Sequence, residues 1–298
     1  MTAAIFFFAL HVIVKIVAIF GITFAMQHPA QFAADPTSAA VYVWSIQNIG
    51  AIDIWTGTLA MLAFGVHVIG ARATLLFFIA ATTISAAAEL TGTKTGWPFG
   101  GYEYADFLGY KLLGRVPYTI PLSWFYMGFA AFLLGAKIAQ ARGLKAATAL
   151  GILFGAWLLT AWDLVLDPAM ASPRMTSVHF WTWHEHGAYF GMPVRNFVGW
   201  FGTGLLFIGA ARLAWRREFD LRGMAAWFPF IMYASNVMWA MALSASVGLW
   251  ETAVAAIALS LFPAALAFAP ARQAQAPAAP SALPPAPHRT SPEPSSGG

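Results

Sequence analysis

The sequence predicts an all-α membrane protein: a polytopic bundle of about eight transmembrane helices with two long, functional loops on the non-cytoplasmic side. Of its 298 residues, 59% are hydrophobic and only 9% are charged, whereas a soluble domain carries about 25% charged residues. The mean hydropathy is +0.67. The apolar residues also gather in runs of about the 20 residues that a helix needs to cross a bilayer. Lipid is therefore the expected solvent for most of the surface.

Eight apolar runs approach this length. The first is too long for the core of a signal peptide and has neither a basic stretch before it nor a convincing cleavage site, so we expect it to be retained. The second carries Asp53 and His67, and only Val247-Gly248 separates the last two. The expected spans are 4–26, 47–70, 73–91, 120–140, 146–166, 196–214, 225–245 and 249–269.

The distribution of lysine and arginine predicts the orientation. Ten of these residues lie on one side of the eight-helix arrangement and five on the other, while Lys15 lies within the first span. Because positive residues favour the cytoplasmic side, both termini are expected in the cytoplasm and the protein in the cell (inner) membrane. Residues 1–270 are expected to form one membrane domain, and residues 271–298 a disordered tail rich in Pro, Ala and Ser.

Composition also excludes several function classes. The absence of cysteine removes disulfides, thiolate nucleophiles, iron–sulfur clusters and cysteine zinc sites. Sixteen Lys and Arg against twelve Asp and Glu give a net charge of +4, but the positive residues are scattered between apolar runs. This pattern does not favour nucleic-acid binding.

Polar chemistry concentrates in the loops 92–119 and 167–195. With the adjoining helix ends, they hold half of the acidic residues and three of the seven histidines. The loop 27–46 is also long but offers only His28 and Asp35. Chemical activity is therefore expected in the first two loops.

Three acidic residues belong to the first of these loops or the helix before it. Glu89 lies near the outer end of an apolar helix, where an ionisable group faces a cavity or a partner; Lys94 and Arg115 are candidate partners for a purely structural pair. Glu103 and Asp106 stand among aromatic rings and could act as acid and base if their surroundings separate their pKa values. The alternative for this segment is an ordinary aromatic interfacial loop.

Asp163 and Asp167 are four residues apart, which places them on one face of a helix. Two carboxylates close together in a low dielectric cannot both ionise cheaply, so one is expected to keep a proton near neutral pH and serve as a donor. The structural alternative is a pair bound to Arg174 or Arg195. Pro168 is expected to end this helix.

The densest polar segment contains His184, Glu185 and His186. A His-X-His pair alone is a weak zinc signal, and the seven histidines of the chain are too few for a membrane di-iron centre. No metal is therefore expected, and the imidazoles suit a base, a proton shuttle or a hydrogen-bond anchor; the alternative is simple wetting of an interfacial loop. Asn196 opens the next span, either as a helix cap or to orient a water molecule.

In order along the chain, several of these segments resemble the membrane carotenoid hydratases of the CruF type and are similar to archaeal bisanhydrobacterioruberin hydratases. The likeness covers roughly residues 85–205. It is carried by two blocks of motifs: 97–109, 116–117 and 120–125, then 163–168, 181–183, 187–193 and 196–201.

The resemblance implies a hydro-lyase that adds water across the terminal 1,2 (or 1′,2′) double bond of an acyclic carotenoid end, giving a tertiary alcohol. The implied substrate is γ-carotene, lycopene or a related carotene taken from the bilayer, with other enzymes of carotenoid biosynthesis as candidate partners. No cofactor is needed, because the reaction requires only an acid, aromatic faces that stabilise a cation, and a base near water.

We therefore assign roles to the residues as a hypothesis. The proton donor is the Asp163–Asp167 pair, with Glu103 and Asp106 as the next candidates. His184 or His186, with Glu185, takes the proton from water. The aromatic wall and the remaining substrate contacts are Trp97, Tyr102, Tyr104, Trp181, Trp183, Tyr189, Asn196 and Trp200.

Three other functions remain open. A membrane lycopene-type cyclase also begins by protonating a terminal alkene but leaves the mass unchanged. An intramembrane prenyltransferase would hold a metal diphosphate with Asp-rich motifs, of which the chain offers one. A transporter or assembly protein would explain the intramembrane acids, but not their concentration with aromatic residues in two loops.

Overall fold

The computed structural model describes residues 1–32, 34–175 and 179–269, so the expected tail at 271–298 lies outside the described residues. Eight helices in this part are long and apolar enough to cross a membrane, which confirms the all-α, multi-pass fold class. The spans are α1 (Thr2–Thr23) continued by η1 (Ala25–Gln27), α3 (Pro36–Val68), α4 (Ala71–Thr95), α5 (Ile120–Ala141), α6 (Ala147–Met170), α7 (Arg195–Trp215), α8 (Trp227–Ser246) and a composite Trp250–Phe268.

The last span is not one regular helix. It consists of α9 (Trp250–Ala256), a π-helical turn η3 (Ile257–Leu261), α10 (Phe262–Ala265) and η4 (Leu266–Phe268). Pro263 lacks the N–H that would bond the Leu259 carbonyl, and the indole Nε1 of Trp157 donates to this carbonyl instead, at 3.1 Å. A π turn beside a proline is a common response to such a lost bond.

A side-chain hydrogen bond likewise compensates for a proline inside α6, and this helix ends later than expected. Pro168 was expected to stop this helix, but α6 continues to Met170. Pro168 leaves the Leu164 carbonyl without its helical donor, and the Tyr189 hydroxyl donates to that carbonyl at 2.9 Å. A side chain from the second long loop thus allows the helix to pass its proline.

The region 27–46, expected to be a loop, is mostly helical. It contains the short α2 (Pro29–Phe32) and the first turns of α3. Pro36 occupies the first turn of α3, and the carboxylate of Asp35 accepts hydrogen bonds from the backbone N–H groups of Thr37 and Ser38 at 2.9 and 3.1 Å. An acidic cap followed by proline is a strong helix start, so α3 begins well before the apolar run.

Helix α5 is the centre of the bundle, with most of its residues buried. It packs closely on α6 through glycines. A Cβ atom on Gly155 would lie 2.8 Å from the Cα of Phe132, and one on Gly135 would lie 2.8 Å from the backbone nitrogen of Gly155. Gly151 and Gly155 form a small-xxx-small pattern, which allows the close approach of membrane helices.

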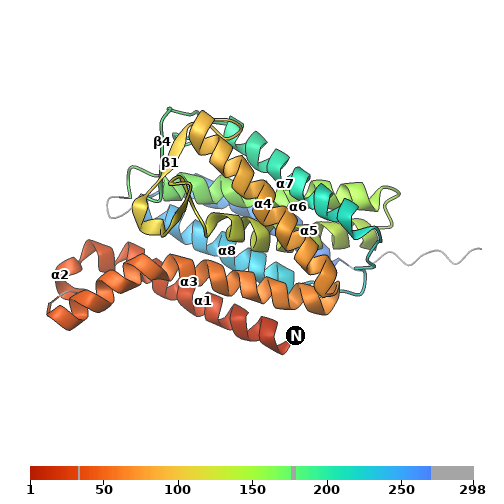
Figure 1. Ribbon diagram of the computed structural model, residues 1–298, viewed down its shortest axis with the longest axis horizontal. Coiled ribbons are helices and arrows are strands. Elements are labelled where there is room, and N and C mark those ends of the chain that lie inside the picture. Colours follow the sequence, from red (N-terminus) through yellow and green to blue (C-terminus); the bar gives the residue numbers. More distant parts are fainter. Residues whose placement is uncertain (33, 176–178, 270–298) are drawn as a thin grey trace, which may run out of the picture.

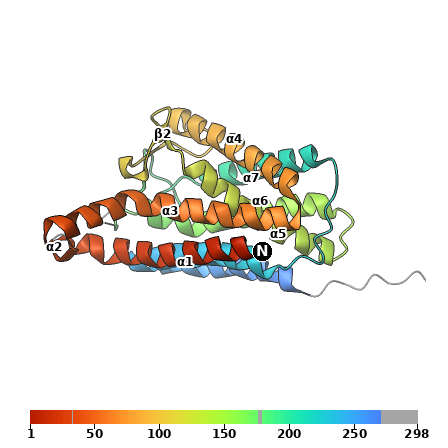
Figure 2. The same cartoon turned by 60° about the horizontal axis from the view of Figure 1, so that its bottom comes forward.

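The helices run along one common direction, with α1 and α3 side by side as a hairpin against the remaining spans (Figures 1 and 2). The first helix begins and the last helical segments end toward the same end of the bundle. The short strands and α2 lie at the opposite end. These strands belong to the two long loops.

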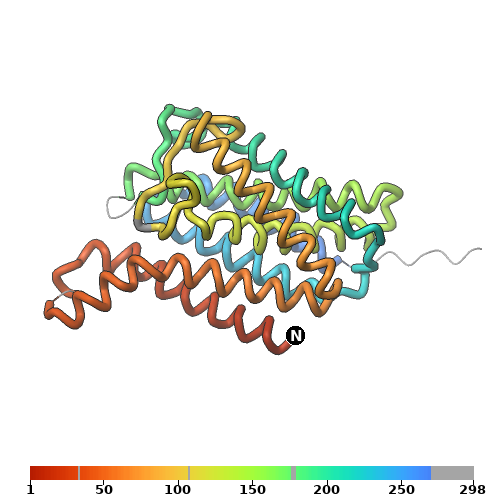
Figure 3. Tube along the Cα trace, viewed as in Figure 1, coloured from red at the N-terminus to blue at the C-terminus, as the bar shows by residue number. Residues whose placement is uncertain are grey.

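Two segments far apart in sequence meet at this end (Figure 3). Strand β1 (Tyr102–Tyr104) pairs antiparallel with β4 (Trp181–Trp183), so that Tyr102 lies opposite Trp183 and Tyr104 opposite Trp181. A second small ribbon joins β2 (Lys111–Leu112) to β3 (Val116–Pro117), after the turn η2 (Asp106–Leu108). The two loops thereby form one cap over the helix ends.

Candidate active site

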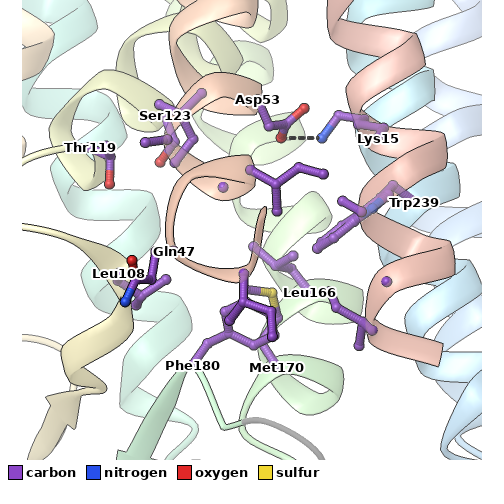
Figure 4. Close-up of a pocket in the computed structure, with 18 of the residues that line it drawn as sticks. Lys15, Gln47, Asp53, Leu108, Thr119, Ser123, Leu166, Met170, Phe180 and Trp239 are labelled. Carbon is purple, nitrogen blue, oxygen red and sulfur yellow. Dashed lines mark hydrogen bonds and ion pairs between the residues drawn. The ribbon is translucent and has the colours of Figure 1, made fainter. Parts of the chain in front are cut away.

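A cavity of about 640 Å³ lies inside the bundle below this cap. Its walls come from α1, α3, α4, α5, α6, α7, α8 and both long loops. The volume falls in the range of small-molecule sites, which are mostly apolar with a few polar groups. In Figure 4, Lys15 and Trp239 line one side, Thr119 and Ser123 the other, and Leu166 and Phe180 lie between them.

Glu89 is a buried carboxylate in this wall, with 3% of its surface exposed. Its Oε2 accepts hydrogen bonds from the hydroxyls of Tyr102 and Tyr104, the second at 2.9 Å, and its Oε1 accepts one from the Trp124 indole at 2.9 Å. Burial and the Glu89 carboxylate raise the pKa of both tyrosines, so both remain donors. Three donors around one acid are hydrogen bonds that favour its ionised form over its protonated form.

Asp163 and Asp167 lie on one face of α6, as their spacing predicted, and both are buried. The side-chain amide of Asn196 bridges them: its Nδ2 donates to Oδ2 of Asp163 at 2.8 Å and to Oδ2 of Asp167 at 2.7 Å. Asp163 Oδ1 is buried and has no hydrogen-bond partner among the described residues. Asp167 lines the cavity, while Asp163 lies behind it.

Asn196 is not the cap of α7. The helix begins at Arg195 after Val194, so Asn196 is already inside its first turn. Its side chain points back to α6 instead of capping its own helix. The capping interpretation is therefore wrong, and the orienting of a water molecule by Asn196 stays a prediction.

The ribbon of the two loops supplies one aromatic wall. Because successive side chains of a strand point to opposite faces, Tyr102, Tyr104, Trp181 and Trp183 share the face toward the cavity. Tyr102 lies 5.2 Å from the ring of Trp183, and Tyr104 lies 5.9 Å from that of Trp181, centroid to centroid. All four therefore line the cavity, and their role as substrate contacts stays a prediction.

The helices supply a second aromatic wall. The rings of Trp124 and Trp200 stack at 3.9 Å, and Trp162 meets Trp200 edge-on at 5.9 Å. All three line the cavity. Trp200 was expected in the site, whereas Trp124 and Trp162 were not assigned to it, although Trp162 adjoins Asp163 and Trp124 belongs to the motif 120–125.

The expected structural pairs do not form. Within the described part of the chain, no ion pair involves Glu89, Asp163 or Asp167. Arg115 donates to the Thr93 carbonyl and Arg174 to carbonyls at 247 and 248. The three acids thus lie together without an ion-pair partner. Burying acids in this way costs folding free energy, and groups of this kind are typical of functional sites.

The other candidate acids lie outside the cavity. Glu103 is on the outward face of β1, and Asp106 is fully exposed in an ion pair with Lys111 at 2.6 Å. Hydrogen bonding to Lys111 lowers the pKa of the Asp106 carboxyl. Neither residue contacts the buried carboxyl groups, so the geometry does not support a donor role for them.

The proposed histidine base is not supported either. His184 and His186 are exposed and do not line the cavity. Glu185 accepts hydrogen bonds from the Gly101 N–H, at 3.0 Å, and from Arg195, and these two contacts lower its pKa. This trio ties one loop to the other and to the start of α7.

Two of the expected aromatic contacts also lie elsewhere. Trp97 is 71% exposed and outside the cavity. Tyr189 stabilises the carbonyl freed by Pro168, and burial raises its pKa to about 12. Both residues belong to the loops that shape the site, but neither lines it.

The structure adds a polar cluster that was not assigned a role from the sequence. Lys15 and Asp53, from α1 and α3, form an ion pair at 2.8 Å and line the same cavity. His11 and Asn236 lie against them, and the Lys15 ammonium is 5.0 Å from the Trp239 ring centroid. The sequence signal that could have identified this cluster is the presence of ionisable residues in the middle of apolar spans.

A metal centre is not evident from the same geometry. Among residues 1–32, 34–175 and 179–269, no three His, Asp or Glu side chains converge as metal ligands would. The carboxyl groups of the cavity are bonded to amide, hydroxyl and indole groups or to Lys15.

The fold and the site define a multi-pass membrane protein with an aromatic-walled, acid-bearing cavity. The chain belongs to the family of carotenoid biosynthesis proteins, whose model matches residues 49–263. It is 34% identical over 151 residues to the bisanhydrobacterioruberin hydratase of Haloarcula japonica, a match that covers 50% of this chain and 49% of that protein. The chain thus spans about half the length of this curated relative. No solved structure matches the chain.

Proposed function

We propose that the protein is a carotenoid hydratase that adds water to the terminal 1,2 (or 1′,2′) double bond of an acyclic carotenoid end. The observation that carries this proposal is the Asn196-bridged pair of buried carboxyl groups facing an aromatic cavity within the membrane. The name of the relative, a hydratase, supports the same reaction class.

The first step is protonation of the alkene. Two adjacent buried carboxyl groups share one proton, because two negative charges at this separation repel strongly in a low dielectric. Asp167 lines the cavity and delivers the proton to C2 of the alkene. Asp163 lies behind it and is held beside Asp167 by the Asn196 amide.

The second step is stabilisation of the tertiary cation that forms at C1. Indole and phenol faces attract cations through the ring quadrupole, by about 0.5–2 kcal/mol each. The stacked indoles of Trp124 and Trp200 and the ribbon aromatics provide such faces. Glu89, held by three donors, adds in its ionised form a fixed negative charge that requires no reorganisation during the reaction.

The third step is attack of water on C1. Its oxygen forms the new C–O bond, and one of its protons passes to a carboxylate of the cavity. The sum of the steps is alkene plus water giving tertiary alcohol, with no net uptake of protons or electrons. The expected substrates are γ-carotene, lycopene or a similar carotene, which reach the cavity from the bilayer.

The test is pigment analysis after expression in cells that accumulate lycopene or γ-carotene. The expected product is heavier by one water with an unchanged polyene spectrum. Asp167→Asn should lower conversion by about 10²–10⁴-fold, the usual contribution of a general acid. The matched control Asp106→Asn removes an exposed carboxylate outside the cavity and should leave conversion unchanged.

Two results would overturn the proposal. A product of equal mass with a shortened chromophore would show a cyclase, in which the cation is quenched internally. No new pigment, with both substrates present and membrane expression confirmed, would show that these carotenes are not hydrated.

We also propose residence in the cell (inner) membrane with both termini in the cytoplasm, following the distribution of basic residues. Other enzymes of carotenoid biosynthesis are the proposed neighbours that supply the substrate. Reporters fused after residue 270 and within 92–119 should report opposite sides of the membrane. Reporters on the same side would contradict the orientation.

A further inference from the structure

One end of the cavity carries the Lys15–Asp53 pair, to which the proposed function assigns no role so far. In α1, the first residue that lines the cavity is Lys15. In α3, the lining residues extend from Thr37 to Ile54 and include Asp53. At 1.5 Å per residue, this stretch of α3 is about 25 Å long. Tyr126 and Asn236 line the same end from α5 and α8.

The cavity opens sideways between α1 and α3. Val17, Phe20 and Val41 line the cavity and are at the same time 49%, 50% and 61% exposed. Since these helices are apolar on their outer faces, the opening leads to lipid. A linear carotene that enters here places its terminal carbons beside Lys15 and Asp53.

The Lys15–Asp53 pair combines a donor and an acceptor. The Lys15 ammonium has three N–H groups and uses one for Asp53 Oδ2 at 2.8 Å, with its position fixed further by the Trp239 ring. Its remaining N–H groups have no acceptor among the described residues. Because the charges of Lys15 and Asp53 cancel, the pair suits a small neutral molecule that both accepts and donates hydrogen bonds.

A buried polar chain holds this pair in place. His11 is fully buried, and its Nδ1 lies 2.9 Å from the Asp53 carbonyl and 3.0 Å from Asp53 Oδ1. Its Nε2 accepts a hydrogen bond from the Asn236 amide at 3.2 Å, and Asn236 accepts one from the Tyr126 hydroxyl at 3.1 Å. Fixed side chains of this kind preorganise a polar site.

From this geometry we infer that Lys15 and Asp53 bind the water molecule that attacks C1 in the proposed hydration. Lys15 donates a hydrogen bond to the water oxygen, and Asp53 accepts one from it. When the oxygen bonds to C1, the water proton moves to the Asp53 carboxylate. Water bound to a tertiary carbocation is strongly acidic, so a carboxylate that is paired with an ammonium suffices as the base.

The proton balance closes within one cycle. The Asp163–Asp167 pair gives one proton to C2, and Asp53 receives one from the attacking water. When the alcohol leaves, water entering the cavity returns the proton from Asp53 to the pair. His11 and Asn236 act as positioning residues, because neither contacts the reacting atoms in this arrangement.

This inference rests on the proposed function, and an isotope experiment separates the two. Membranes containing the full-length protein are incubated with lycopene in D₂O. Wild-type protein should give the alcohol carrying deuterium at C2. With Asp53→Asn, protonation at C2 continues but capture by water fails, so hydration should fall at least 10-fold while the recovered lycopene gains deuterium as the cation reverts.

The matched variants make the result specific. Asp167→Asn should abolish both hydration and deuterium gain, since no cation forms. Lys15→Arg retains the cation and should restore part of the hydration that is lost in Lys15→Met. A merely structural role of the pair would lower both readouts together in every variant.

Two outcomes would overturn the inference: normal hydration by Asp53→Asn, or equal loss of hydration and deuterium gain in this variant. Failure of the wild-type protein to produce any alcohol would instead refute the proposed function itself.

Discussion

Replacing Asn196 by leucine is a sharp test of the acid pair. The side chains are similar in size, but the leucine cannot donate the hydrogen bonds of 2.8 and 2.7 Å to Asp163 and Asp167. Each hydrogen bond to a charged group is worth about 1.5–3 kcal/mol. Because the pair shares one proton, one of the two bonds has this charge-assisted character, and the other is worth about 1 kcal/mol.

Asn196→Leu is therefore expected to lower the free energy of unfolding by about 2.5–4 kcal/mol. The variant should show a lower thermal unfolding temperature in detergent and a loss of hydration of at least 10-fold, because the pair is no longer held toward the cavity. Asn48→Leu is the matched control: Asn48 is half-buried, lies outside the cavity lining, and donates to the Trp44 carbonyl of its own helix at 2.8 Å. It should change neither measurement. If Asn196→Leu hydrates carotene at the wild-type rate, the bridged pair is not the acid.

Three further predictions test other parts of the structure. Gly155→Leu should destabilise the protein by about 1–3 kcal/mol through overpacking, since even its Cβ would lie 2.8 Å from a backbone Cα; an unchanged unfolding temperature would contradict the close packing. Tyr189→Phe should lower the free energy of unfolding by about 1 kcal/mol by leaving the Leu164 carbonyl without its donor, with little change in the rate of hydration. A fall in that rate as large as the fall caused by Asp167→Asn would place Tyr189 in the chemistry instead. The double variant His184→Ala/His186→Ala should keep wild-type conversion, because both rings lie outside the cavity; a loss above 10-fold would restore the histidine base.

The membrane bundle was predictable from the sequence because a segment that crosses lipid must be both apolar and long enough to span the bilayer. Each apolar run had to be helical, since no other local structure satisfies backbone hydrogen bonds in lipid. The helix ends were less accessible. Pro168 and Pro263 would normally break a helix, and their tolerance depends on Tyr189 and Trp157, which approach from elsewhere in the chain.

The candidate site was predicted in part for the same reason. The spacing of Asp163 and Asp167 follows from helix geometry alone, so their shared face was predictable. The alternation of Tyr102, Glu103 and Tyr104 depends on a strand pairing across about 80 residues of sequence. The sequence therefore marked this segment as important without showing that Glu103 faces outward.

The cluster around Lys15 and Asp53 was not predicted, because it also depends on contacts between segments far apart in sequence. Each residue was visible as an ionisable group in an apolar span, but neither was assigned a partner or a role. Their meaning arises from the packing of α1 against α3, which places opposite charges at 2.8 Å. No local pattern encodes that contact.

The central claim is that carotene is hydrated with an oxygen atom taken from water at a carboxylic acid site. The most direct measurement is mass spectrometry of the pigment formed from lycopene by wild-type membranes in ¹⁸O-labelled water. The account predicts one heavy oxygen atom in the alcohol and none in membranes carrying Asp167→Asn. An alcohol without the label, or equal labelled product from the variant, would contradict it.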